Sequence, residues 1–222
     1  MQASHATSVP AAGTQAARSL LTCGVIGAPL FIIASLVQVF ARDGFDPARH
    51  PISMLSLGDL GWIQVANFVV CGALIAVSAV GLRRALHPGR GGTWGPILIA
   101  LFGLSLIGGG VFLADPGLGF PPGAPEGPPA SVSTAGIVHG IAFGIGMLSL
   151  ITSFFVFARL FARTGDRGWS RYSVVSGVLF LAMIVLGMTT QDFRILTAAT
   201  VVGWGWLALA IAHVRSWIIP GR

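Results

Sequence analysis

Charged residues are scarce in this chain. They make up 9% of its 222 residues, whereas a soluble domain of ordinary composition carries about 25%. Hydrophobic residues account for 54% of the chain, and the mean hydropathy is +0.84. So few charges cannot cover the surface of a soluble domain. This composition excludes a cytosolic enzyme and a disordered regulator, and it predicts a chain embedded in lipid.

Lysine is absent, so all 13 basic residues are arginine. A strongly basic chain can bind nucleic acid, but these arginines lie beside apolar stretches, as the positive-inside rule of membrane proteins describes. We therefore expect no nucleic-acid partner. Cysteine is also rare. Cys23 and Cys71 both lie in apolar stretches, which excludes a disulfide scaffold and indicates small packing residues.

Six apolar stretches are each long enough to cross a bilayer, whose core of ~30 Å needs about 20 helical residues. Continuous stretches of this length are typical of helices and unlike the shorter alternating segments of membrane β-barrels. The predicted fold is all-α, a polytopic transmembrane bundle of six helices. A disordered cytoplasmic tail, residues 1–19, precedes a transmembrane domain, residues 20–219. The expected spans are Leu20–Ala41, Gly61–Leu82, Trp94–Ala114, Gly136–Phe161, Ser170–Thr190 and Leu196–Ile219.

Charge differs between the two sets of connecting segments. Ten arginines and one aspartate flank the chain ends and the second and fourth connections, a net charge of +9. The other connections carry three arginines against six acidic residues, a net charge of −3. Arginine concentrates on the cytoplasmic side of membrane proteins. We therefore expect both termini in the cytoplasm and the protein in a bacterial plasma membrane.

Two connections on the outer side are long. Residues 42–60 contain a short apolar stretch, residues 52–57, that can lie along the membrane interface. Residues 115–135 contain six prolines and four glycines, which argues against a regular helix there. Loops of this length are usually functional or mobile.

Polar residues from separate parts of the chain are expected at one depth near the outer surface. Asp115 ends the third span, His139 lies one turn inside the fourth, and Asp192 follows the fifth. Ionisable groups within a span usually face the protein interior or a wet cavity. Each aspartate is also typical of a solvated helix end, and His139 of a histidine bonded to a loop carbonyl. Candidates for ligand binding at this depth are Arg49, Ser53, Gln64 and Arg194, with His50, Asp59 and Gln191 nearby.

This set of residues can act in three ways. Imidazole and carboxylate groups can bind a divalent metal, His139 can act as a base oriented by an aspartate, and an arginine can bind a phosphate head group. No spacing matches a metal motif such as two histidines four residues apart on a helix, and no nucleophile elbow or phosphate-binding loop is present. The sequence therefore specifies neither a metal nor another cofactor, and it leaves open whether the protein is an enzyme.

Small and amide residues within the spans predict how the helices pack. Gly136, Gly140 and Gly144 lie four residues apart on one helix face. This glycine stripe predicts close packing of the fourth span inside the bundle, and it also offers a seam for a homodimer. Asn67, nearly two turns inside the second span, is predicted to hydrogen-bond to a neighbouring helix.

One set of short motifs runs through the chain: the segment His50-Pro51-Ile52-Ser53-Met54-Leu55-Ser56-Leu57-Gly58, then Gln64, Asn67-Phe68, Arg83-Arg84, Asp115-Pro116 and His139. Together these motifs resemble the bacterial membrane-protein family catalogued as domain of unknown function 998. The resemblance covers nearly the whole chain, from about Leu20 to the sixth span. It implies a six-helix integral membrane protein and carries no established activity. It points to Ser53, Asp115 and His139 as positions of interest and assigns them no role.

Three functions remain open from the sequence. The first is a non-enzymatic membrane protein that handles a lipid or supports a partner complex, because no catalytic motif is present. The second is a membrane-embedded enzyme that acts on a lipid or isoprenoid at the outer leaflet, using the polar residues beneath the long loop. The third is a small-solute transporter that acts as a dimer. Membrane lipid is the partner that we expect from composition alone.

Overall fold

The computed structural model describes residues 11–88, 91–129 and 131–218. Each of the six α-helices in this part of the chain is long and apolar enough to cross a membrane, and these residues form no β-strand. The predicted all-α fold of six helices is therefore confirmed. In chain order the elements are α1 (Ala11–Ala41), the 3₁₀ helix η1 (Ile52–Ser56), α2 (Gly61–Leu86), α3 (Gly91–Val111), α4 (Thr134–Arg163), α5 (Arg167–Thr190) and α6 (Phe193–Ser216).

The helices differ from the predicted spans mainly at their ends. α1 begins at Ala11, so the prediction of a disordered tail is wrong for residues 11–19; residues 1–10 of that tail lie outside the described residues. The stretch before Leu20 is too polar to count as a span, but its alanines favour a helix. α2 likewise continues to Leu86, past the apolar part that ends at Leu82.

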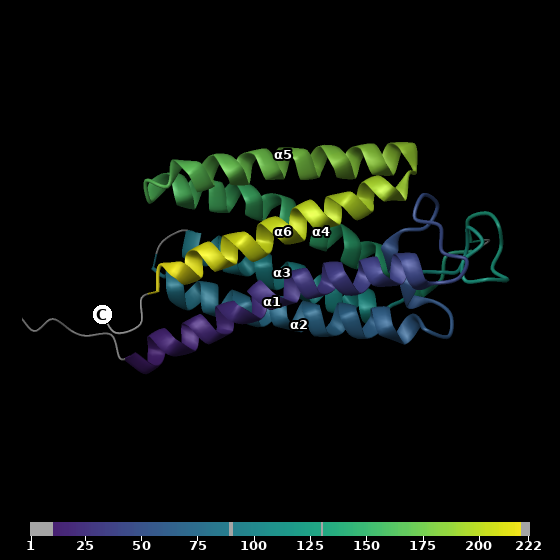
Figure 1. Ribbon diagram of the computed structural model, residues 1–222, viewed down its shortest axis with the longest axis horizontal. Helices are drawn as coiled ribbons and strands as arrows, with labels where there is room; N and C mark the ends of the chain where they lie inside the picture. The colour runs from purple at the N-terminus through teal and green to yellow at the C-terminus, as the bar shows by residue number, and fades with distance from the viewer. Residues whose placement is uncertain (1–10, 89–90, 130, 219–222) are drawn as a thin grey trace, which may run out of the picture.

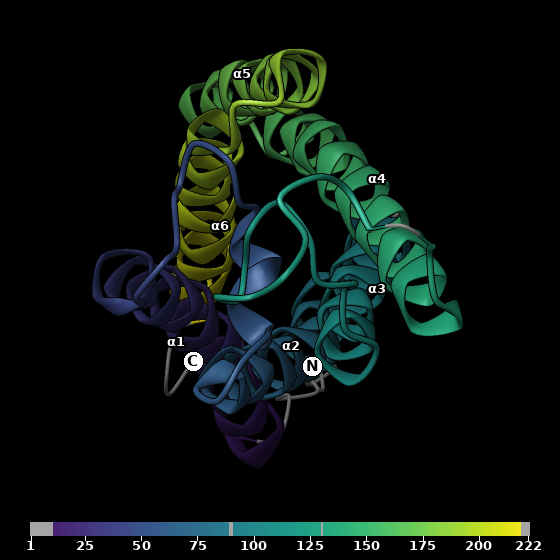
Figure 2. The same ribbon diagram turned by 90° about the vertical axis from the view of Figure 1, so that its right-hand side faces the viewer.

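The six helices form a closed ring. Each helix packs against the next in the chain, and α6 closes the ring by packing against α1. Figure 2 shows this arrangement end-on, with η1 lying inside the ring and packing against α1 and α2. Ile52 of η1 packs against the main hydrophobic core of the bundle. The prediction that residues 52–57 lie along the interface is therefore wrong, because buried core contacts draw this segment inward.

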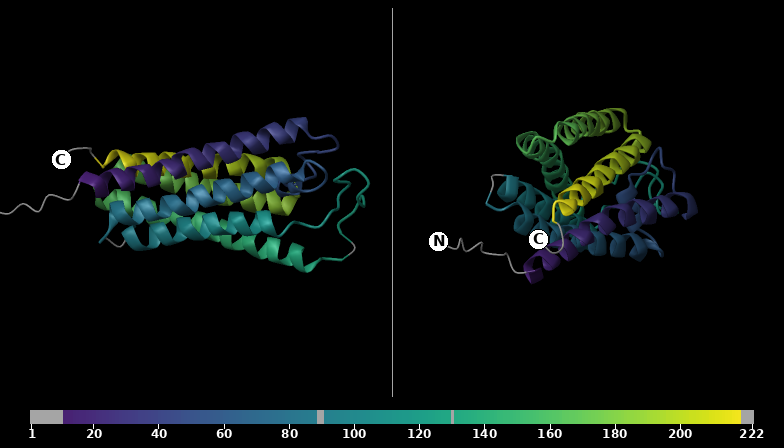
Figure 3. Two further views of the ribbon diagram at one scale, coloured as in Figure 1. Left: turned by 90° about the horizontal axis from the view of Figure 1, so that it is seen from below. Right: turned by 60° about the vertical axis from the view of Figure 1, so that its left-hand side comes forward.

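The two ends of the bundle are different. At the end that we call the terminal end, α1 begins and α6 ends, and Nη1 of Arg18 donates to the carbonyl oxygen of Ile218 at 2.6 Å. The opposite end, which we call the loop end, carries the long segments 42–60 and 112–133 (Figures 1 and 3). The last turn of α2 with Arg83 and Arg84, the last turn of α4 with Arg163 and the start of α5 with Arg167 all lie at the terminal end (Figure 1). The predicted charge asymmetry thus corresponds to the two ends of one bundle.

The two long segments at the loop end fold against each other. Phe45 from the first and Phe120 from the second meet edge to face, with 5.3 Å between ring centroids. Arg42 donates to the carbonyl oxygens of Leu55 at 3.0 Å and Leu57 at 2.6 Å. Its guanidinium also lies 5.5 Å from the centre of the Phe120 ring. Arg42 therefore holds the end of η1 in place, and both loops form one packed cap over the ring.

Glycines do bring helices close together, but not the ones that the stripe predicts. A Cβ atom on Gly72 would lie 2.6 Å from the carbonyl oxygen of Gly103. A Cβ atom on Gly103 would likewise lie 2.6 Å from the carbonyl oxygen of Gly72. Only glycine permits so close a crossing of α2 and α3. By contrast, no described atom lies within 4 Å of a Cβ built on Gly140 or Gly144. Close packing of that stripe inside the bundle is not found, because this face of α4 points away from the other helices.

Candidate functional site

His50 is a structural residue of the loop-end cap. Its side chain is 2% exposed. Nδ1 accepts a hydrogen bond from the backbone N–H of Asp46 at 2.8 Å, and Nε2 lies 2.8 Å from the carbonyl oxygen of Leu118. Because Nδ1 accepts, Nε2 carries the proton and donates to that carbonyl. Both ring nitrogens are engaged, so His50 joins the two long loops and has no nitrogen left for catalysis.

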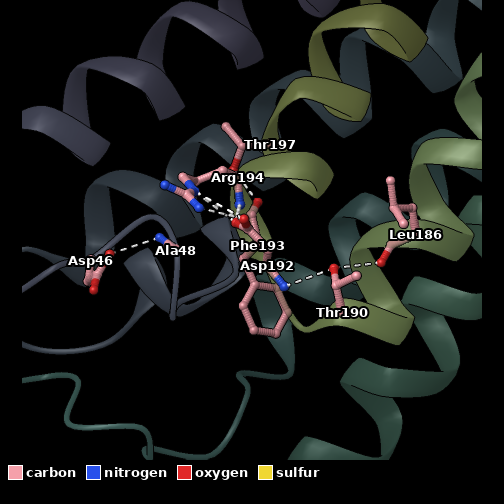
Figure 4. A network of polar contacts seen from close by, with 8 residues as sticks. All are labelled: Asp46, Ala48, Leu186, Thr190, Asp192, Phe193, Arg194 and Thr197. Carbon is pink, nitrogen blue, oxygen red and sulfur yellow. Dashed lines mark hydrogen bonds and ion pairs between the residues drawn. The ribbon is translucent and has the colours of Figure 1, made fainter.

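Asp192 and Arg194 pair with each other at the start of α6 (Figure 4). Nε and Nη2 of Arg194 donate to the two carboxylate oxygens of Asp192 at 2.9 and 2.6 Å. The same carboxylate accepts from the backbone N–H of Arg194 at 3.1 Å, which caps the helix. The Arg194 guanidinium holds the pKa of Asp192 below its usual range. This geometry engages both residues with each other rather than with a ligand.

Asp115 fixes the entrance to α4. Its carboxylate accepts from the backbone N–H of Ser133 at 2.9 Å. Ser133 in turn caps α4, because its hydroxyl oxygen accepts from the N–H of Gly136 at 3.0 Å. Hydrogen bonding from the side chain and from the backbone N–H of Ser133 holds the pKa of Asp115 below its usual range. A side chain at Gly136 would overlap the Asp115 carboxylate, so this glycine of the stripe is needed for the turn.

Two of the remaining ligand-binding candidates are also engaged by other parts of the chain. Arg49 forms an ion pair with Glu126 at 3.2 Å, with side chains 50% and 84% exposed. A pair this exposed contributes only about 0–1 kcal/mol. Gln64 is fully buried between helices, where its side-chain oxygen accepts from Gln38 at 2.7 Å.

Gln64 belongs to a buried polar network between α1 and α2. The side-chain nitrogen of Asn67 donates to the carbonyl oxygen of Phe31 and to the hydroxyl of Ser35, each at 3.2 Å. The predicted hydrogen bond from Asn67 to a neighbouring helix is confirmed. The network pairs neutral groups of two adjacent helices, and it holds α1 and α2 together.

His139 bonds to the end of α3. Its Nδ1 lies 3.2 Å from the carbonyl oxygen of Gly109 and 2.9 Å from that of Phe112. Within the described residues, no hydrogen bond or ion pair joins His139 to Asp115 or Asp192. The structure therefore shows the histidine bonded to main-chain carbonyls, one of the two readings that the sequence left open, and it does not show a histidine–aspartate pair at this end.

A cavity lies inside the ring, in its loop-end half. Its empty space, including a part that is open to the outside, measures about 590 Å³, and every helix contributes to its wall. Side chains from η1 and the residue before it close it on one side. Its polar lining consists of the hydroxyls of Ser53, Thr197 and Thr200 and the indole N–H of Trp204. Both threonine hydroxyls donate to carbonyls of their own helix, whereas the Trp204 N–H has no partner among the described residues. The lining residues are Phe31, Pro51, Ile52, Ser53, Phe68, Leu106, Phe143, Met147, Phe180, Ile184, Leu196, Thr197, Thr200 and Trp204. We call this space the central cavity.

A second, smaller space of about 330 Å³ adjoins the central cavity, and we call it the side chamber. Five residues line both spaces, among them Ser53 and Phe143. The side chamber also reaches His139 and Ser105. The structure thus brings Ser53 and His139, two of the predicted site residues, to the wall of one space. Sequence reasoning missed the apolar wall that surrounds them.

The residues that the structure describes include no cluster of three or more histidine, cysteine or acidic side chains placed to hold a metal ion. Neither cavity is lined by a charged aspartate, glutamate or arginine. What this arrangement can do chemically is enclose an apolar group and offer it a few hydroxyls and one imidazole.

A family model described as "Protein of unknown function (DUF998)" matches residues 25–214. The chain belongs to this family. The match runs from α1 to α6, so it includes the cap and both cavities of this DUF998 protein. Neither a curated protein nor a solved structure matches the chain. Family membership therefore confirms the resemblance seen in the motifs, but it assigns no function.

One polar pair of the DUF998 protein, His213 and Asp166, was not predicted from the sequence. At the terminal end, Nε2 of His213 lies 2.8 Å from the carboxylate of Asp166. The His213 ring stacks on Trp169, with centroids 4.2 Å apart and planes at 14°. Asp166 also accepts from the backbone N–H of Trp169 at 3.3 Å, which caps α5. In the sequence, Asp166 lies three residues before Trp169, the spacing of a helix cap. This spacing could have indicated that Asp166 caps a helix, but not that it pairs with His213. The pair joins the start of α5 to the end of α6.

Proposed function

We propose that this protein resides in a bacterial plasma membrane with both termini in the cytoplasm, and that it binds a membrane lipid or isoprenoid by a hydrocarbon chain. The supporting observation is the central cavity, whose wall is built from apolar side chains of all six helices. An apolar cavity does not hold ordered water, because water needs two to four polar partners. A hydrocarbon chain fills such a space through dispersion contacts.

The position of Phe143 supports entry from the bilayer. This side chain lines both cavities and is 42% exposed. Its neighbours on α4, Ile141, Ile145 and Leu148, are 56%, 46% and 67% exposed. Exposed apolar side chains on a membrane-spanning helix face lipid. A chain that passes Phe143 therefore enters sideways from the membrane rather than from water.

The same features favour binding over the two rival functions. The catalysis predicted from the sequence has His139 as a base oriented by an aspartate, but within the described residues its Nδ1 binds the carbonyl oxygens of Gly109 and Phe112, and no hydrogen bond joins it to Asp115 or Asp192. Transport of an ion or a polar solute usually relies on ionisable or polar groups along an inner path, and the cavity wall has no charged group. Binding of an apolar chain needs neither feature.

Lipid retention by a cavity-filling variant tests the proposal. Thr200→Trp places an indole in the central cavity, whereas Val201→Trp adds the same group at a neighbouring position that is 43% exposed. We expect native mass spectrometry to find about one retained lipid chain on the wild type and on Val201→Trp, and none on Thr200→Trp. Equal retention by two folded variants would refute the proposal. Ser53→Trp fills the same cavity from the other side and serves if Thr200→Trp does not fold.

We also propose that any homodimer forms through the outer face of α4. Gly140 and Gly144 have open space beside them in the described chain, and small residues let two helices approach closely. We expect Gly144→Leu to lower the cross-linked dimer fraction in bilayers. Gly205→Leu, at another glycine with open space beside it, is the control that should leave the fraction unchanged.

A further inference from the structure

The central cavity and the side chamber are adjacent spaces that share part of their walls and differ in polarity. Ser53, Phe68, Leu106, Phe143 and Met147 line both. The central cavity is mostly apolar. Its polar groups are the Thr197 and Thr200 hydroxyls, which bond within α6, the Ser53 hydroxyl and the Trp204 indole N–H. The side chamber ends at the imidazole of His139 and the hydroxyl of Ser105. A ligand that fills both parts therefore meets hydrocarbon at one end and a polar group at the other.

The hydrogen bonds of His139 determine what its ring offers to a ligand. Both partners of Nδ1 are carbonyl oxygens, of Gly109 and Phe112, and a carbonyl oxygen can only accept. Nδ1 therefore carries the proton. In that tautomer Nε2 has a lone pair and acts as an acceptor. No described residue donates to Nε2. The imidazole that lines the side chamber therefore has one acceptor nitrogen available to a group that brings a proton of its own.

The Ser105 hydroxyl adds no competing donor. Its proton is engaged, because it donates to the carbonyl oxygen of Phe102 at 2.8 Å. Its oxygen retains lone pairs and can accept as well. No arginine or other cation lines either space, so a buried carboxylate or phosphate would lack a counter-charge, which is costly in an apolar site. The polar end thus favours a neutral group, and one that donates can bond to Nε2 of His139.

We propose that the side chamber binds the hydroxyl group of a long-chain lipid alcohol, which donates to Nε2 of His139 while its chain occupies the central cavity. This inference rests on the proposed function, since it needs the chain to lie in the central cavity. The shared chemistry is a hydroxyl on a chain of at least several methylene or isoprene units. The source is either a straight-chain alcohol or an isoprenoid alcohol, and the experiment below separates them.

Matched probes that differ only in the hydroxyl proton test the inference. Hexadecanol and its methyl ether have the same chain, but the ether cannot donate. We expect the wild-type full chain in nanodiscs to bind hexadecanol about five- to tenfold more tightly than the ether, the usual effect of one added hydrogen bond. Farnesol and its methyl ether form the second arm, and the alcohol with the larger preference over its ether identifies the chain type.

A histidine variant and its control test whether the preference for the alcohol over the ether depends on His139. His139→Leu should bring the ratio of alcohol to ether affinity close to one while ether binding persists. His87→Leu changes an exposed histidine at the terminal end and should leave the ratio unchanged. If His139→Leu does not fold, the wild-type ratio decides alone.

The outcomes separate the two proposals. A wild type that binds neither alcohol nor ether refutes the proposed function and this inference together. Equal binding of alcohol and ether refutes the inference and leaves chain binding intact. A preference that persists in His139→Leu also refutes it, because the hydroxyl would then be recognised elsewhere. Palmitate carries a charged carboxylate in place of the hydroxyl. If it binds more tightly than hexadecanol, then the side chamber does not favour a neutral group and the inference is wrong.

Discussion

The close crossing of α2 and α3 makes the clearest prediction about stability. In Gly103→Ala, the new Cβ would lie 2.6 Å from the carbonyl oxygen of Gly72 and 2.6 Å from the nitrogen of Ala76. Both are backbone atoms of α2, so they cannot move aside unless the helix shifts. Overpacking of this kind costs about 1–3 kcal/mol, and alanine regains up to ~1 kcal/mol in a helix interior. We expect Gly103→Ala to lower the free energy of unfolding by about 1–2 kcal/mol.

A second alanine variant isolates the steric contribution. No described atom lies within 4 Å of a Cβ built on Gly205, so Gly205→Ala changes helix propensity without a clash. It should be neutral or stabilising by up to ~1 kcal/mol. Unfolding in mixed micelles with rising SDS content, followed by tryptophan fluorescence, measures both variants. If Gly103→Ala unfolds with the wild type, or if both variants lose equal stability, then the close crossing is not what disfavours a side chain at position 103.

Three further predictions concern the cap, the polar network and the orientation. Ser133 lowers the pKa of Asp115, so the ionised carboxylate stabilises the fold above about pH 4. That stabilisation is lost as the pH falls through the lowered pKa; the wild-type Tm should therefore fall more steeply in acid than that of Asp115→Asn, and equal slopes would contradict this. Asn67→Leu removes bonds to Phe31 and Ser35 and should cost about 0.6–1.7 kcal/mol in the SDS assay; an unchanged midpoint would contradict it. A fluorescent protein fused after Arg222 should fluoresce and an alkaline phosphatase fusion stay inactive, and the reverse pattern would overturn the proposed orientation.

Hydropathy located the six helices because each contains a stretch of about 20 apolar residues. It did not locate their ends, since a helix can continue through polar residues beyond the lipid. The segment before Leu20 shows this, because its alanines continue α1 to Ala11. Length and composition therefore predict how often the chain crosses the membrane. Helix propensity is needed to predict how far each helix extends beyond it.

The sequence predicts that the polar residues at the loop end share one depth in the membrane. In the structure, these residues form hydrogen bonds with other partners. Asp192 pairs with Arg194 two residues later, and Asp115 binds the residue that caps α4. An acidic residue directly before a helix is a common cap, so the role of Asp192 was readable from the sequence. The bond from Asp115 to Ser133, 18 residues later, was not. A shared depth brings residues to one level of a bundle, but it does not choose among partners around the ring. Local hydrogen bonds form at a smaller cost in chain entropy.

The central cavity could not be predicted from the sequence, for a different physical reason. In a membrane, the side chains that face lipid and those that line an interior space are equally apolar, so hydropathy cannot separate Leu148, which is exposed, from Met147, which lines both cavities. The direction of each helix face depends on the packing of its neighbours. Ser53 reaches His139's chamber only because Arg42 and His50 hold the first loop inward through bonds to backbone groups. Hydropathy does not register these backbone partners, and it therefore places residues 52–57 at the membrane interface.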